Sequence, residues 1–420
     1  MEEGCKRDAR KAGEYICFSF KVLFKWILFG IITGISVGLV LTAFAYSLGS
    51  AVSYRESHPA MFYGLPLGGM VIVALYKIIG SDPGTNIIIS AVRSEKEVPA
   101  LLVPLIFVST IVTHLFGGSA GREGAALQLG GGVSEILGKF MKISEKDRQI
   151  VIMCGMAAGF SAIFGTPLAS AIFAMEVIAV GVMPYSALVP CVFSAFVANL
   201  LATHLGVAAE SFAVQIVPEL SPKHFIIIIL LSTLFGLLST LFCTMLHSVQ
   251  KLLQKFFRNS YVRICVSAGA IILVTKLIGT TDYMGAGMPL VERAFAIPAG
   301  PEVFFLKMVL TALTLGAGFK GGEIVPSFCI GATFGSMLAG LLGLPVNLTA
   351  ACGMLGVFCG VTNCPLTSLF IGFELFGFAG MPYYAISVAV SNMMSGYNGL
   401  YHEQKMRCSK FELEFFNNNK

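Results

Sequence analysis

The sequence predicts an all-α integral membrane protein made of two inverted-topology repeats that contain broken and half-length helices. Its apolar composition, its apolar runs and an internal duplication predict this fold class. Hydrophobic residues make up 56% of the 420 residues and charged residues only 12%, about half the charge of an ordinary soluble domain. The mean hydropathy is +0.81. We therefore expect the chain to lie in a lipid bilayer.

The apolar runs fall into two groups. Runs in the first group approach the length that spans about 30 Å of hydrocarbon; they cover 26–49, 61–80, 99–116, 183–203, 225–246 and 262–279. Runs in the second are too short, or too interrupted by Gly and Pro, to span alone; they cover 84–93, 123–138, 148–163, 167–181, 323–343, 350–361 and 365–379. We expect half-helices there, buried against neighbours, because lipid tolerates no unpaired backbone. The mixture is typical of a transporter or channel.

The domain organisation follows from the duplication. We expect a cytoplasmic N-terminal tail at 1–16, a first membrane repeat at 17–208, a second at 209–401 and a short C-terminal tail at 402–420, forming one transmembrane domain. The first 25 residues are rich in Lys and Arg, which by the positive-inside rule places the N-terminus in the cytoplasm. No cleavage site follows a short apolar core, so the first span is retained. We expect a multi-pass protein of the cell membrane with both termini cytoplasmic.

Several function classes are disfavoured. The net charge of +5 reports membrane topology and gives no support for nucleic-acid binding. The 11 cysteines and 6 histidines show no metal-ligand spacing, so we expect no metal and no cofactor. No P-loop, dinucleotide fingerprint or nucleophile elbow is present. We therefore expect no enzyme, although an intramembrane enzyme or a membrane scaffold is the alternative from another class.

The duplication itself is visible in matched residues. A stretch that contains Cys154, Phe160, Pro167 and Glu176 recurs at the same spacing in the second half as Cys352, Phe358, Pro365 and Glu374. A Gly-Glu turn that opens an apolar segment also occurs in each half, at 121–124 and 321–323. Repeats with broken helices place a substrate site between the halves, near the bilayer midplane.

The first turn, in the segment 117–132, carries Glu123 between glycines. Glycines permit a sharp turn, and the free N–H groups and dipole of the following helix favour an anion. A carboxylate there competes with an external anion, and protonating it would vacate the site. The alternative is that Glu123 only caps its helix and pairs with Arg122. Ionisable residues inside a membrane bundle favour the functional interpretation.

The second turn, in the segment 318–327, carries Glu323. Pro326 suits the first turn of a helix, and the preceding glycines let the amides of Ile324 and Val325 approach a ligand. With inverted topology this helix start would face that of the first repeat. The alternative is a second helix cap paired with Lys320.

Two weaker segments complete the candidates. Thr85 and Asn86 precede a short apolar helix and supply neutral donors, although such residues usually serve as helix caps. Tyr401 ends the last apolar run at a Gly-rich stop, where interfacial anchoring is the ordinary role of tyrosine.

Taken together, these motifs resemble the CLC family of chloride channels and proton-coupled anion antiporters over nearly the whole chain. Gly-Arg-Glu-Gly at 121–124 is identical to the gating-glutamate motif of that family, and the segment 322–326 stands at its Gly-x-Phe-x-Pro motif. The resemblance implies a CLC-like homodimer with one anion pathway per subunit. It implies gating and proton coupling by Glu123 and Glu323. The implied anion-binding residues are Thr85, Asn86, Arg122, Gly124, Ile324, Val325 and Tyr401.

The departures from the family pattern are informative. Gly-Thr-Asn-Ile-Ile at 84–88 and Gly-Glu-Ile-Val-Pro at 322–326 look like the bacterial fluoride/proton antiporter branch. The internal proton-transfer glutamate of chloride/proton exchangers falls on Val177, a loss expected for that branch. The branch usually has threonine where this chain has Val325.

We therefore predict a fluoride/proton antiporter that exports fluoride through a gating-glutamate mechanism. Its expected partners are fluoride or chloride, protons, the lipid bilayer and a second copy of the chain. The alternative is a chloride/proton antiporter or a passive chloride channel of the same family.

Overall fold

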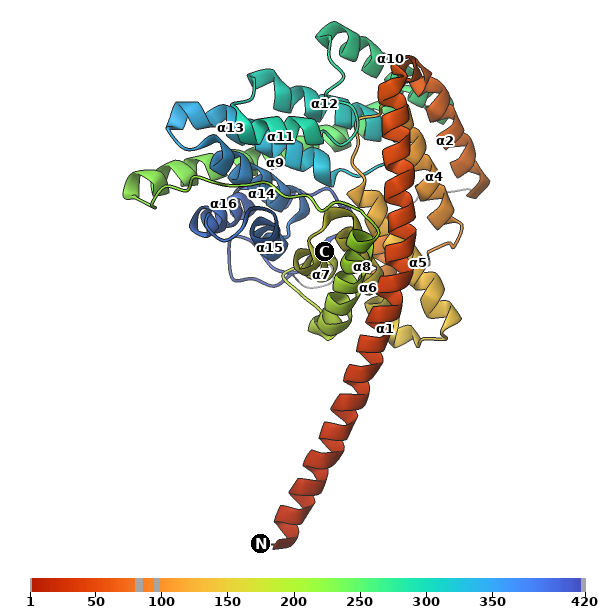
Figure 1. The fold of residues 1–420 in the computed structure, drawn as a ribbon, viewed down its shortest axis with the longest axis vertical. Coiled ribbons are helices and arrows are strands. Elements are labelled where there is room, and N and C mark those ends of the chain that lie inside the picture. The colour runs from red at the N-terminus through yellow and green to blue at the C-terminus, as the bar shows by residue number, and fades with distance from the viewer. Residues whose placement is uncertain (1, 80–85, 94–97, 417–420) are drawn as a thin grey trace.

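The computed structural model describes residues 2–79, 86–93 and 98–416, and these are almost entirely helical (Figure 1). The first half contains α1 (Glu2–Ser57), η1 (Pro59–Gly64), α2 (Leu65–Ile79), α3 (Asn86–Val92), α4 (Leu102–Leu115), α5 (Glu123–Phe140), α6 (Glu145–Phe164), α7 (Pro167–Glu176), β1 (Ala179–Val180), η2 (Tyr185–Ala187) and α8 (Leu188–His204). The second contains α9 (Pro222–Phe256), α10 (Ser260–Ile278), α11 (Met288–Ala296), α12 (Pro301–Ala317), α13 (Ile324–Leu342), α14 (Val346–Thr362), α15 (Pro365–Phe376), α16 (Met381–Met394) and β2 (Lys405–Met406).

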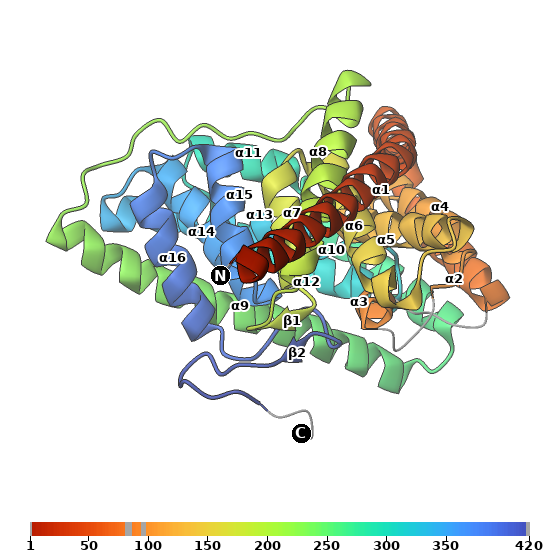
Figure 2. The ribbon, with the colours of Figure 1, turned by 90° about the horizontal axis from the view of Figure 1, so that it is seen from below.

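In Figure 1, α1 runs along one side of the body and its N-terminal part projects beyond it. Figure 2 shows β1 and β2 side by side near the C-terminal tail. These two strands pair in parallel, with Ala179 opposite Lys405. The tail is thereby held against the end of the first half.

Among the described residues, seven helices are long and apolar enough to cross a membrane. Five of them agree with the spans predicted at 26–49, 61–80, 183–203, 225–246 and 262–279. The prediction of a span at 99–116 is wrong, because α4 has only 14 residues. It ends where Gly117 adopts a positive φ of 80°, a conformation that glycine accepts without strain.

The prediction of half-length helices at 148–163 and 323–343 is also wrong. Helices α6 and α13 have 20 and 19 residues and are continuous. Their apolar windows are 78% and 72% buried inside the protein. Glycine does not break them, because neighbouring helices pack against the helix faces that the glycines leave open. True short helices remain at α3, α7 and α15, with 7, 10 and 12 residues.

Matched glycines hold one helix pair together in each half. A Cβ atom on Gly155 would lie 2.1 Å from the carbonyl oxygen of Gly130, so α5 and α6 touch backbone to backbone. In the second half, a Cβ on Gly353 would lie 2.2 Å from the carbonyl oxygen of Gly331 on α13. Small residues at helix crossings permit this approach in membranes. The duplication in sequence therefore corresponds to a duplicated helix pair.

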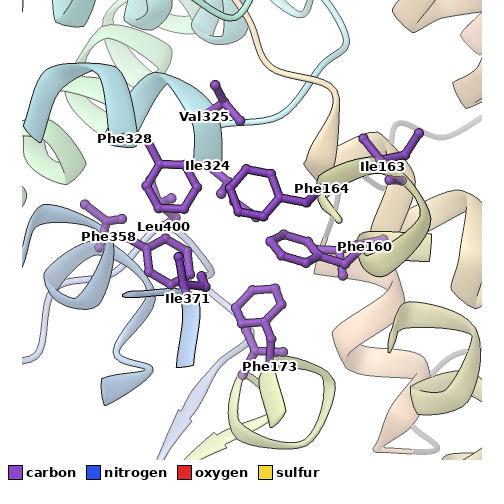
Figure 3. Close-up of a cluster of buried hydrophobic side chains, with 14 of the residues drawn as sticks. Phe160, Ile163, Phe164, Phe173, Ile324, Val325, Phe328, Phe358, Ile371 and Leu400 are labelled. Atoms are coloured by element: carbon purple, nitrogen blue, oxygen red, sulfur yellow. The ribbon is translucent and has the colours of Figure 1, made fainter. Parts of the chain in front are cut away.

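The two halves meet in a cluster of phenylalanine rings (Figure 3). Phe164 stacks on Phe328 with ring centroids 5.3 Å apart, and Phe328 lies 4.9 Å from Phe358. Phe173 closes the cluster at 6.0 Å from Phe358. Phe160 and Phe358 occupy equivalent places in the two repeats. This aromatic cluster (Phe160, Phe164, Phe173, Phe328 and Phe358) is fully buried and gives the centre of the molecule an apolar wall.

We predict that Gly155→Ala destabilises the protein by at least about 1–3 kcal/mol, because the new methyl group meets backbone on α5. The midpoint of thermal unfolding in detergent measures the effect. Gly269→Ala is the matched control, since Gly269 has no neighbour within 4 Å of its Cβ position. The control should unfold at or slightly above the wild-type midpoint. Equal midpoints for both variants would contradict the proposed close contact.

Candidate functional site

The two Gly-Glu turns meet at the centre of the protein. Gly121 and Gly322 form an antiparallel bridge in which each amide donates to the carbonyl oxygen of the other, at 2.8 and 2.7 Å. Helix α5 begins two residues after Gly121, and α13 begins two residues after Gly322. The bridge therefore places the starts of two helices from opposite halves side by side.

This contact requires glycine. A Cβ atom on Gly322 would lie 2.5 Å from the amide nitrogen of Gly124, and one on Gly121 would lie 3.2 Å from the carbonyl oxygen of Gly322. A Cβ on Gly321 would lie 2.5 Å from the side chain of Ala120. At Gly322 the neighbour is backbone of α5, so no side chain fits there. At Gly121 and Gly321 a side chain would require neighbouring atoms to move. The glycines around both glutamates are thus explained by backbone contact between the turns.

The segment before Glu123 is anchored to the second half by a buried lysine. Lys307 on α12 donates from Nζ to the hydroxyl of Ser119 at 3.0 Å and to the carbonyl oxygens of Gly285 and Tyr283 at 2.7 and 3.1 Å. The amide of Ser119 also donates to the hydroxyl of Thr314 at 3.1 Å. Three hydrogen bonds use the full donor capacity of the ammonium group, so the turn is held firmly.

Glu123 is the first residue of α5, and its side chain is only 2% exposed. Its carboxylate accepts a hydrogen bond from the amide of Arg122 at 3.0 Å and a longer contact of 3.4 Å from the guanidinium group. That guanidinium also donates to Glu210 at 2.9 Å. Burial raises the pKa of the Glu210 carboxyl, and Arg122 opposes the rise. One cation is therefore shared by two acids, which leaves Glu123 incompletely compensated.

Glu323 reaches from the second half towards the first. Its Oε2 atom lies 3.6 Å from the Cβ position of Gly124, in the first turn of α5. This oxygen is buried and has no hydrogen-bond partner among the residues that the structure describes. The side chain of Glu323 makes no capping hydrogen bond on α13, so the capping part of the alternative is wrong. The ammonium group of Lys320 lies over the ring of Tyr76, 4.4 Å from its centroid.

The start of α13 combines polar amides with an apolar wall. The first N–H groups of a helix have no partner within the helix and carry the positive end of its dipole. Here they include the amides of Ile324 and Val325. The side chains of both residues are buried in and beside the aromatic cluster (Figure 3). The side chain of Val325 offers no polar group, so its amide is its only donor.

A polar cavity of about 220 Å³ adjoins Glu323. Tyr401 lines it together with Glu323. The ordinary interfacial role of tyrosine does not apply to Tyr401, because its side chain is 5% exposed and lies in the core. Its hydroxyl group has no partner within the described part of the chain. Tyr401 and Glu323 thus offer unpaired polar atoms to one space.

Most of the predicted site residues come together. Arg122, Glu123 and Gly124 lie at the start of α5, and Glu323, Ile324 and Val325 at the start of α13, as the bridge requires. Thr85 lies outside the described residues, as does the side chain of Asn86. Asn86 begins α3, which packs against α5 through a side chain near Gly131.

The role of one matched pair, Glu176 and Glu374, was not predicted from the sequence. Glu374 at the end of α15 accepts hydrogen bonds from the amides of Leu168 and Ala169 at the start of α7, at 2.9 and 2.8 Å. Glu176 at the end of α7 does the same for Leu366 and Thr367 at the start of α15, at 3.0 and 2.8 Å. Each carboxylate caps the helix of the other repeat. The matched positions were visible in sequence, but their partners were not.

Known proteins of one family match this sequence over most of its length. Residues 68–396 match the family described as "Voltage gated chloride channel". The chain is 36% identical over 397 residues to the chloride/fluoride channel protein of Pseudomonas syringae pv. tomato, covering 92% of this chain and 87% of that protein. It is 25% identical over 388 residues to the H(+)/Cl(-) exchange transporter ClcA of Vibrio cholerae, covering 85% and 82%.

Solved structures give the same result. The crystal structure of a CLC-type fluoride/proton antiporter superposes with a TM-score of 0.88 at 35% identity, covering 91% of this chain and 98% of that chain. A slow cyanobacterial Cl-/H+ antiporter shares the fold with a TM-score of 0.76 at 18% identity, covering 88% and 94%.

We predict that Glu374→Ala destabilises the protein by about 1–3 kcal/mol, because two partly buried amides at the start of α7 lose their acceptor. Thermal unfolding in detergent measures the change. The control is Glu292→Ala at an exposed position on α11, which should shift stability by less than about 0.5 kcal/mol. A Glu374 variant as stable as this control would rule out the reciprocal caps.

Proposed function

Because the chain belongs to the voltage-gated chloride channel (CLC) family, as its motifs predicted, we propose that it is a fluoride/proton antiporter and not an enzyme. It exports fluoride in exchange for protons that move inward. The protein is an all-α, multi-pass membrane protein with the fold of that family.

One observation carries the proposal. Two buried carboxylates from opposite halves lie at adjoining helix starts, and one oxygen of Glu323 has no partner in the described structure. Burial in an apolar interior favours the neutral form of a carboxyl group, so each of the two can take up a proton. The same helix starts favour an anion. Proton and anion binding are therefore linked at one place.

In the proposed cycle, Glu123 blocks the pathway as a carboxylate. On protonation it loses its attraction to the guanidinium group of Arg122 and leaves the helix start as a neutral acid. The carboxylate of Glu323 then accepts a hydrogen bond from the protonated carboxyl group of Glu123. The proton passes from Glu123 to Glu323 along this bond. The anion then occupies the vacated helix start. This exchange couples the movement of the anion to the movement of the proton.

Fluoride fits this site better than chloride. A small, tightly hydrated ion needs several short N–H and O–H donors in place of water. The amides of Ile324 and Val325, the amide of Gly124 and the hydroxyl of Tyr401 supply such donors, and Thr85 and Asn86 are further candidates. The relative from Pseudomonas syringae and the solved antiporter with 35% identity both carry fluoride in their names, which supports this choice.

A chloride/proton antiporter or a passive chloride channel on the same scaffold is the second candidate. Val325 favours this second candidate. The fluoride branch usually has threonine at this position, and the apolar side chain of valine offers no hydrogen-bond donor in its place. The aromatic cluster likewise gives the start of α13 looser, apolar surroundings. Against it stands Glu323, whose charge repels any anion that does not arrive with a proton.

Assembly and orientation belong to the same proposal. We place the protein in the cell membrane as a homodimer with both termini in the cytoplasm. Lys25, in the first half of α1, pairs with Asp147 at the start of α6 at 2.5 Å. Lys25 therefore lies on the same side as the basic segment at 139–148, which supports a common cytoplasmic face.

We predict that Glu123→Gln abolishes fluoride-driven proton uptake in proteoliposomes, lowering it by at least about 100-fold. An amide cannot exchange a proton at this position. A fluoride electrode, a chloride electrode and a pH probe record the three fluxes in the same sample. Glu323→Gln should also lose proton coupling, whereas Glu292→Gln on the exposed face of α11 should match the wild type.

Chloride flux equal to or faster than fluoride flux in the wild type would favour the second candidate. Fluoride-selective, proton-coupled flux that survives in Glu123→Gln would remove Glu123 from the mechanism.

We further predict that Val325→Thr raises fluoride affinity about fivefold or more, because one added hydrogen bond contributes about 1 kcal/mol. Fluoride titration calorimetry on the purified protein measures it, and Val325→Ala is the control without a hydroxyl group. Equal affinities in the two variants would show that the side chain at this position does not reach the ion.

A further inference from the structure

We propose that His247 and His402 form the proton acceptor that carries protons from Glu323 to the cytoplasm. This inference rests on the proposed function and extends it to residues that the gating mechanism does not use. It begins from the polar cavity beside Glu323, which continues well beyond the site itself.

The cavity joins Glu323 to the end of α9. Its lining includes His247, Gln250 and Gln254 on α9. These three residues repeat at intervals of three and four, so they share one face of the helix. Arg263 near the start of α10 lines the same cavity. The cavity thus extends from the buried carboxylate to the turn between α9 and α10, which we expect on the cytoplasmic side from the basic residues Lys251 and Lys255.

The two histidines lie in contact. Their ring centroids are 4.0 Å apart with an interplanar angle of 32°. His247 also forms a hydrogen bond with the backbone of Leu400. His402 directly follows Tyr401, whose hydroxyl lacks a partner in the described structure. One short segment, 400–402, therefore connects the imidazole pair to the interior end of the cavity.

The charges around the pair favour a group that accepts a proton and releases it again. Two imidazoles in contact cannot both be protonated without repulsion. The groups that face the pair or the cavity are Lys251 on α9, Arg263 on α10, Tyr76 on α2, Lys320 in the turn, Glu323, Tyr401 and, further off, Cys243 and Lys410. Glu323 is the one carboxylate among the described lining residues. Lys251 is close enough to act on His247, so a proton on the pair is repelled by a neighbouring cation and leaves readily.

The step itself is a simple transfer. The carboxyl group of protonated Glu323 gives its proton to a chain of water molecules, for which about 220 Å³ has room. The glutamine side chains of Gln250 and Gln254 can orient such a chain. The last water of the chain protonates an imidazole nitrogen, and the imidazolium then releases the proton to cytoplasmic water. The neutral imidazole ring suits this role because one of its nitrogens can accept a proton and later release it.

The structure also shows why another acceptor is required. Val177 occupies the position that the resemblance assigned to an internal proton-transfer glutamate, and it is buried and cannot carry a proton. Its neighbour Glu176 is engaged in capping α15. Protons that reach Glu323 therefore need a different route, and the cavity supplies one.

The test is fluoride-driven proton uptake in proteoliposomes that contain His247→Gln/His402→Gln, with the pH of each side varied separately. In the wild type, uptake should slow as the cytoplasmic side becomes more acidic, because a protonated pair cannot accept. In the double variant, uptake should fall at least about tenfold near neutral pH and lose this dependence. Equilibrium fluoride affinity, measured by calorimetry, should stay within about twofold of wild type.

The matched control is His224→Gln, at the opposite end of α9, where the ring contacts the carbonyl oxygen of Glu219. It should behave as wild type. His402→Gln alone changes an exposed side chain and should give a smaller loss of proton uptake. This single variant replaces the double variant if the double variant does not fold. Wild-type uptake and pH dependence in the histidine variants would overturn the inference.

Reduced fluoride affinity with an unchanged pH profile would also overturn it, since the pair would then belong to the anion pathway. Wild-type protein that moves fluoride without protons would overturn the proposed function and this inference together. If wild-type flux is coupled to protons and the histidine variants behave as wild type, the inference is overturned and the proposed function stands.

Discussion

The backbone bridge between Gly121 and Gly322 is the constraint on which the site depends. It brings the positive ends of α5 and α13 together from two halves of the chain. The glycines around it cannot be replaced without a clash, and Lys307 holds the preceding segment in place. Each of these helix starts carries a buried glutamate. In the proposed mechanism, the anion and the proton both act at these joined helix starts.

The surroundings of the bridge divide into an apolar and a polar side. The aromatic cluster seals the start of α13 and lowers the local dielectric, which strengthens every charge interaction there. The cavity with Tyr401, His247 and His402 gives Glu323 access to polar groups. The guanidinium group of Arg122 lies beside the buried carboxyl group of Glu123 and also donates to Glu210. Each glutamate thus has its own polar environment, which fits the proposed entry of protons through one and their exit through the other.

Much of this arrangement could be predicted from sequence, because the duplication and the Gly-Glu turns are local patterns. The fold class, the position of Glu123 and the approach of the two helix starts follow from them. Helix lengths were less predictable: glycine-rich α6 and α13 stay continuous since packing overrides propensity. The pairing of His247 with His402 and the caps of Glu176 and Glu374 join residues far apart in the chain, so no local pattern predicted them.

Calorimetry of fluoride binding in buffers with different ionisation enthalpies tests the central claim most directly. If the ion and a proton share the site of Glu123 and Glu323, the observed binding enthalpy must vary with the buffer, with a slope of about one proton taken up per fluoride bound. The slope should vanish in the double variant Glu123→Gln/Glu323→Gln. A wild-type enthalpy that is independent of the buffer would contradict the account.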